Sequence, residues 1–202
     1  IAVMRIAIGL KARTGRAVLV AVGGSVGEPL LVERSQLPLL PDGAFAPYHA
    51  AQKLEALEAH KSVARSIAAA QELATSGIGD AARRLVAAGH DLRGCAVLVG
   101  TGMPGWTTDE ILAVHVRMHK AEGELFRDVL VSGVRACGLA LATLPEKSAL
   151  DDAARTLGLT RTQLDARLIG LGKAAGPPWG KDQKEAAAAA LVALAQASRE
   201  RE

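Results

Sequence analysis

Apolar residues dominate the first 40 positions in three runs, and short polar or glycine-containing connections separate these runs. The runs span residues 2–10, 16–22 and 30–39. The first two contain many β-branched side chains and meet at a turn that contains Gly15, which is typical of a β-hairpin. The third alternates apolar side chains with Glu33 and Arg34, as expected of an edge strand. We therefore predict an antiparallel β-meander over residues 1–40.

From Tyr48 the apolar positions recur at helical spacing. This pattern predicts a long helix that Gly77 and Gly79 break, and then a shorter helix from Asp80 to about Ala88. Strands and helices alternate afterwards. We expect a buried strand at Cys95–Val99, a helix from a cap at Thr107 or Thr108 to Ala136, a strand at Leu139–Leu144, and helices at 149–157, 160–169 and 181–198.

The order of these elements predicts the fold. Alternating strands and helices in the second half require parallel pairing with right-handed crossovers, which places the first strand in the centre of the sheet. We predict one α/β domain over residues 1–202 with a mixed five-stranded sheet of order 3-2-1-4-5. Its three antiparallel strands precede two parallel ones, and helices cover both faces. The parts are the meander, a helix-strand-helix unit over 47–136, and a strand with C-terminal helices over 139–202.

Composition narrows the class of protein. A formal charge of +3 and a pI near 9.1 permit contact with nucleic acid without indicating a strongly basic footprint. Apolar runs stay shorter than the roughly 18 residues of a membrane span, and the first residues lack the pattern of a signal peptide. Cys95 and Cys137 form no C-x-x-C pair. We expect a soluble, cytoplasmic protein with reduced thiols and no membrane partner.

Two groups of side chains could carry chemistry. His115, His119 and Glu122 share one stripe of a predicted helix, a spacing that could hold Zn²⁺ with a fourth ligand from elsewhere. A solvated helix face is the alternative, and Val116 excludes an H-E-x-x-H motif. A second group could bind phosphate if the predicted fold brings it together, the alternative being scattered surface charge. It comprises Lys11, Arg13, Lys147, Lys181 and Lys184.

Motifs near both ends of the chain resemble the RuvC-type Holliday-junction resolvases, which have a ribonuclease-H-like fold. The apolar strand Ile6–Leu10, followed by a turn with Thr14 and Gly15, resembles the opening hairpin of that family. Residues 144–147, which read Leu-Pro-Glu-Lys, resemble its proline-to-lysine segment. A glycine-proline loop that leads to Asp182-x-x-Glu185 and an alanine-rich helix resembles its last-helix carboxylate motif.

The resemblance implies two divalent cations, held by carboxylates from the first strand, the fourth strand and the last helix, that support phosphodiester cleavage. Asp182 and Glu185 match the last-helix positions. Lys11 stands at the first-strand position, however, and the fourth strand ends in Gly100 without an acid. An ammonium repels Mg²⁺, so the resemblance implies an incomplete metal site.

We therefore expect a RuvC-like module that associates with nucleic acid or another partner without catalysis. The alternative is a metal-dependent phosphodiester hydrolase that uses Asp182 and Glu185 with Glu122 and Glu124, or the imidazoles of His115 and His119. Mg²⁺ or Mn²⁺ would be the cofactor of the carboxylates, and Zn²⁺ is the less favoured choice. A third hypothesis is a structural homodimer formed through a helix lined with alanine and glycine.

Overall fold

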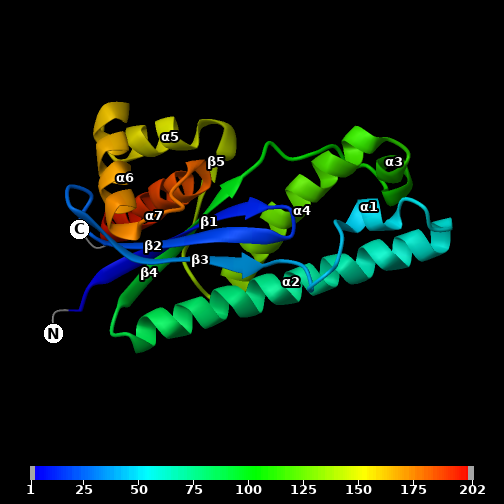
Figure 1. The fold of residues 1–202 in the computed structure, drawn as a ribbon, viewed down its shortest axis with the longest axis horizontal. Helices are drawn as coiled ribbons and strands as arrows, with labels where there is room; N and C mark the ends of the chain where they lie inside the picture. The colour runs from blue at the N-terminus through cyan, green and yellow to red at the C-terminus, as the bar shows by residue number, and fades with distance from the viewer. Residues whose placement is uncertain (1–2, 200–202) are drawn as a thin grey trace.

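The computed structural model describes residues 3–199 and has an α/β architecture built on one five-stranded sheet (Figure 1). The strand order is β3-β2-β1-β4-β5. β1 pairs antiparallel with β2 and parallel with β4, so it is the central strand. This arrangement confirms the predicted fold and sheet order. The strands are β1 (Arg5–Arg13), β2 (Arg16–Gly24), β3 (Pro29–Pro38), β4 (Asp91–Val99) and β5 (Leu141–Pro145).

Helices cover both faces of the sheet, as predicted (Figure 1). α2 and α4 pack with the smaller α1 and α3 on one face, and α5, α6 and α7 lie on the other. The helices are α1 (Pro47–Ala51), α2 (Ala56–Ala87), α3 (Thr108–Leu112), α4 (His115–Ala136), α5 (Ala149–Thr156), α6 (Arg161–Ala175) and α7 (Lys181–Arg199), with a short 3-10 turn at Glu146–Ser148.

Three local predictions are wrong. Gly77 and Gly79 do not break α2, because both lie within the continuous helix and neither adopts a positive φ. The helix predicted up to Ala136 is split, since Val114 adopts an extended backbone between α3 and α4. β1 also continues through Lys11, which was predicted to lie in the connection. The predicted first strand began at Ala2, which lies outside the described residues.

α7 approaches β1 closely enough that only glycine fits between them. A Cβ added to Gly9 would lie 1.8 Å from the carbonyl oxygen of Ala186. The run Ala186–Ala190 is completely buried against the sheet. This contact fixes the first turn of α7 beside the carboxyl end of β1, where the acids of α7 meet Lys11.

Within residues 3–199, no helix combines the length and the apolar character required to cross a membrane. The cytoplasmic location stays a prediction.

Candidate functional site at the carboxyl ends of the strands

The ammonium group of Lys11 lies among three carboxylates at the end of the central strand. Its side chain is only 1% exposed, and its Nζ donates a hydrogen bond to Glu185 on α7. The same nitrogen lies 3.1 Å from Glu146 Oε1 and 3.7 Å from Asp182 Oδ1. The charge of Lys11 is therefore buried and already paired with carboxylates, and binding of phosphate by this side chain stays a prediction.

Arg13 provides a second cation for α7. Its Nε and Nη2 donate to the two carboxylate oxygens of Asp182 at 2.8 and 2.5 Å, a bidentate pair. The hydrogen bond from Arg13, with the charges of Arg13 and Lys11, lowers the pKa of Asp182 against the opposing effect of burial. Asp182 is therefore ionised and shared between Arg13 and Lys11.

Glu146, which follows β5, connects Lys11 to α4. Arg127 on α4 donates from Nε and Nη2 to Glu146 Oε2, at 2.9 and 2.5 Å. Burial alone would raise the pKa of Glu146, but the hydrogen bonds and charges of Arg127 and Lys11 outweigh burial and lower it. Sequence reasoning quoted Glu146 within a motif but did not assign it to the site, although its place after a parallel strand was a usable signal.

Glu124 occupies the space above the end of β4. Its carboxylate accepts a hydrogen bond from Lys120 at 3.0 Å and lies 3.5 Å from Arg127. A Cβ added to Gly100 would lie 2.3 Å from Glu124 Oε1, so this carboxylate depends on the absence of a side chain at Gly100. An acid from α4 therefore lies where the resemblance expected one from the fourth strand.

These contacts join four carboxylates and four cations into one structure, which we call the Lys11 network. Its members are Lys11, Arg13, Lys120, Arg127, Glu124, Glu146, Asp182 and Glu185. The predicted acids Glu124, Asp182 and Glu185 thus belong to one cluster. Each carboxylate of the network has at least one cationic partner within it.

Glu122 lies outside the Lys11 network. Side chains two positions apart on a helix point in different directions, which separates Glu122 from Glu124. The Glu122 carboxylate is buried and accepts hydrogen bonds from the backbone N–H groups of Tyr48 and His49, both at 3.1 Å. It also lies 2.9 Å from Nδ1 of the His49 ring. Glu122 is therefore held by α1, and its ligation of a metal beside His115 and His119 stays a prediction.

His115 and His119 do come together as predicted, with their Nε2 atoms 3.0 Å apart. The ring of His49 packs against both. Sequence reasoning missed His49, because it precedes α4 by more than 60 residues and only the tertiary fold brings it there.

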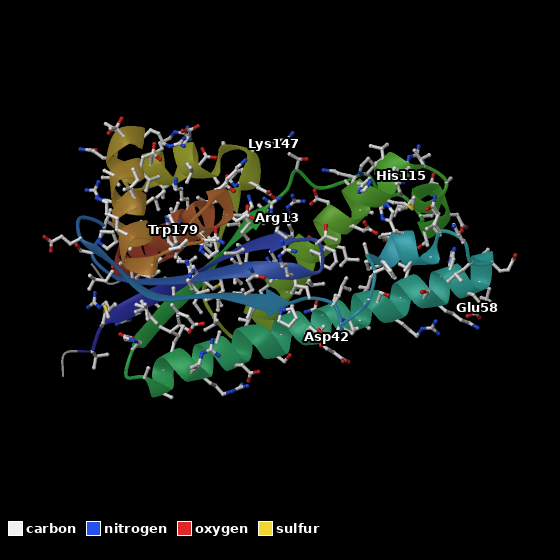
Figure 2. The ribbon with its side chains drawn as sticks, in the orientation of Figure 1. Arg13, Asp42, Glu58, His115, Lys147 and Trp179 are labelled. Carbon is white, nitrogen blue, oxygen red and sulfur yellow. The ribbon has the colours of Figure 1, made fainter. Side chains whose placement is uncertain are left out.

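A cleft of about 520 Å³ opens beside the Lys11 network, and we call it the sheet-edge cleft. It is lined by Val99, Gly100, Thr101, Val116, His119, Lys120, Gly123, Glu124, Arg127, Pro145, Glu146, Lys147 and Lys181. Lys147 and Lys181 are its exposed lysines. Figure 2 shows Lys147 at the outer surface of the molecule. Lys184 lies instead in a neighbouring cleft between α5, α6 and α7, which Lys147 and Lys181 also reach.

Two solved structures are similar to this fold. The structure of Thermus thermophilus RuvC aligns with a TM-score of 0.52 and 10% identity over 96% of both chains. The structure of T. thermophilus RuvC in complex with a Holliday junction substrate aligns with a TM-score of 0.50 and 10% identity, over 93% of this chain and 91% of the other. No protein-family model and no curated protein sequence matches the chain. The chain therefore has a RuvC-like fold.

The two divalent cations that the resemblance implies do not fit these side chains. Mg²⁺ requires nearly octahedral oxygen ligands, and it binds carboxylates whose charge is available. Here the ammonium of Lys11 lies between Glu146, Asp182 and Glu185 and neutralises the group from within. These carboxylates therefore form an internal ion-pair network and not a site for two divalent cations.

Proposed function

We propose that this chain is a nucleic-acid-binding module of RuvC-like fold that holds phosphate groups without cutting them. The observation that carries the absence of cleavage is the buried ammonium of Lys11 among the carboxylates of Glu146, Asp182 and Glu185. A fixed cation at this point supplies the positive charge for which a metal would otherwise be needed. It supplies neither an activated water nor a Lewis acid, which metal-assisted hydrolysis requires.

The charge of the sheet-edge cleft supports binding of phosphate. Four cationic side chains line the cleft against the two carboxylates Glu124 and Glu146. The cations are Lys120, Arg127, Lys147 and Lys181. Lysine and arginine side chains bind the backbone of nucleic acids by releasing condensed counterions, without reading sequence. The RuvC structure that contains a Holliday junction makes branched DNA the first ligand to test.

Fluorescence anisotropy with a labelled four-way junction, a duplex and a single strand tests the proposal. We expect binding whose log K falls linearly with log salt concentration, and no cleavage with Mg²⁺ or Mn²⁺. Lys147→Ala and Lys181→Ala should each reduce the salt slope by about 1. Lys53→Ala and Lys61→Ala remove the same charge from exposed positions outside the cleft and serve as controls.

Three results would contradict the proposal. An affinity that does not change with salt concentration would show that the protein does not bind through phosphate groups. An equal loss in the Lys53 and Lys61 variants would show that net charge, rather than the cleft, attracts DNA. Metal-dependent cleavage that is lost in Asp182→Asn would instead favour the alternative of a hydrolase at these carboxylates.

The hydrolase at the sheet edge has less support, because Arg13 and Lys11 already pair with Asp182. The homodimer stays a prediction, which sedimentation equilibrium tests.

A further inference from the structure

Three imidazoles converge at the junction of α1 and α4. His115 and His119 lie one turn apart on α4 and therefore share a face of the helix, and His49 comes from α1. The ring centroid of His49 is 5.1 Å from that of His115 and 4.6 Å from that of His119. Each ring offers one nitrogen such that all three lie within 4.8 Å of one another. Figure 2 shows His115 at the start of α4, beside α1.

The spacing of these nitrogens suits one shared cation. Zn–N bonds of about 2.0–2.1 Å at tetrahedral angles place two ligand nitrogens about 3.3 Å apart. Nε2 of His115 and Nε2 of His119 are 3.0 Å apart, so a small movement of exposed rings reaches that value. Imidazole nitrogens favour Zn²⁺ and its neighbours, whereas Mg²⁺ and Mn²⁺ prefer oxygen ligands.

Glu122 fixes the tautomer of His49 that can bind a cation. Both carboxylate oxygens of Glu122 lie 2.9 Å from His49 Nδ1 and can only accept, so Nδ1 carries the proton. The lone pair is then on Nε2, the nitrogen that would bind a cation. A carboxylate that fixes the tautomer of a ligating histidine is the usual outer partner of a metal site. Two backbone N–H groups of α1 hold this carboxylate in place.

We propose that His49, His115 and His119 bind one divalent cation that prefers imidazole, with Zn²⁺ as the reference ion, and that Glu122 is the positioning residue of His49. Three protein ligands leave the fourth position of a tetrahedral ion to water or another ligand. His49 and His119 also line a cleft of about 780 Å³, from which such a ligand enters. No residue of the Lys11 network takes part, so this inference does not depend on the proposed function.

Metal titration of protein without a histidine tag tests the site. After dialysis against a chelator, we expect one Zn²⁺ per chain by calorimetry, and one Co²⁺ per chain with the visible absorption of a tetrahedral ion. His115→Ala and His119→Ala should each weaken Zn²⁺ binding at least 100-fold. Both side chains are exposed, so both variants should keep the circular dichroism of the parent.

Glu122→Gln tests whether Glu122 acts by positioning His49. The glutamine amide retains the shape of the glutamate side chain but no longer enforces the tautomer of the His49 ring. It should weaken Zn²⁺ binding about 10- to 100-fold while retaining 1:1 stoichiometry. His60→Ala is the matched control, since His60 is an exposed histidine that pairs with Asp109. The proposal is overturned if the parent binds no stoichiometric Zn²⁺ at micromolar concentration, or if His60→Ala weakens binding as much as His119→Ala. If Glu122→Gln does not fold, the two exposed histidine variants decide the question.

Discussion

Replacing Lys11 with methionine would test how much the buried ammonium contributes to stability. Methionine has nearly the same length and volume, so the change removes the charge with little effect on packing. Asp182 would keep Arg13 and Glu146 would keep Arg127. Among residues 3–199, Glu185 would keep only Lys181, an exposed side chain at 3.7 Å. The variant would thus leave one carboxylate, 4% exposed, close to uncompensated.

The structure sets the size of the effect. Removing one partner of a buried ion pair costs about 3–5 kcal/mol, because the remaining charge is left desolvated. For a chain of this length, such a loss corresponds to a fall in Tm of roughly 6–20 °C. Replacing both partners with apolar side chains of similar volume is often neutral, since no charge remains to be solvated. The double variant Lys11→Met, Glu185→Met should therefore recover most of the lost stability.

Chemical unfolding followed by far-ultraviolet circular dichroism measures these differences, and calorimetry gives the Tm values. Lys61→Met is the control, because Lys61 pairs with Glu58 at the exposed surface of α2 and contributes little there. The reasoning would be refuted if Lys11→Met unfolded within 1 kcal/mol of the parent. A double variant less stable than Lys11→Met would refute it as well, by showing that Glu185 is compensated without Lys11.

The remaining predictions address the same region. Lys11→Asp should create a cluster of carboxylates that binds Mg²⁺, so its Tm should rise with Mg²⁺ while that of the parent does not; equal behaviour in both proteins would contradict this. The pKa values of Asp182 and Glu146 are lower in the folded protein than in the unfolded chain, so both ionised carboxylates stabilise the fold. This stability is fully present at a pH above their ordinary pKa values, and it is lost as the pH falls through the pKa values of the folded state. Unfolding free energy measured from pH 7 down to pH 2 should accordingly fall below about pH 4.3, and a flat profile would exclude this contribution. Gly9→Ala should destabilise the protein by about 1–3 kcal/mol or prevent folding, because its Cβ would collide with an α7 carbonyl. Gly170→Ala, which meets open space within α6, should instead stabilise it by about 0.5–1 kcal/mol, and chemical unfolding compares the two.

The sheet order could be predicted because each strand carries a local signal. The two apolar runs on either side of Gly15 form a hairpin, and the unbroken apolar run at Cys95–Val99 indicates a strand buried on both faces. Chain order and the handedness of crossovers then determine the neighbours. The helix break predicted at Gly77 and Gly79 failed because glycine weakens a helix only modestly, and packing of α2 on the sheet outweighs that cost.

The candidate site was only partly predictable. Asp182 and Glu185 share a helix face, and that relation is visible in the sequence. The partners that decide their chemistry come from other elements, as the pairing of Arg127 with Glu146 shows. His49 could not be predicted as a neighbour of His115 and His119 either, since no local sequence pattern connects α1 to α4. The identity of Lys11 indicated that a metal site was incomplete, but only its burial shows that the lysine is enclosed by the acids.

The contact of α7 with Gly9 has a consequence for how the chain tolerates change. Alanine has no side-chain rotamers, so Ala186–Ala190 lose no rotamer entropy when they dock on the sheet. For the same reason these five alanines have no side chain of their own that could rearrange around a larger neighbour. We therefore expect few substitutions at Ala186–Ala190. The position of the last helix on the central strand should persist even where the charged residues at its end diverge.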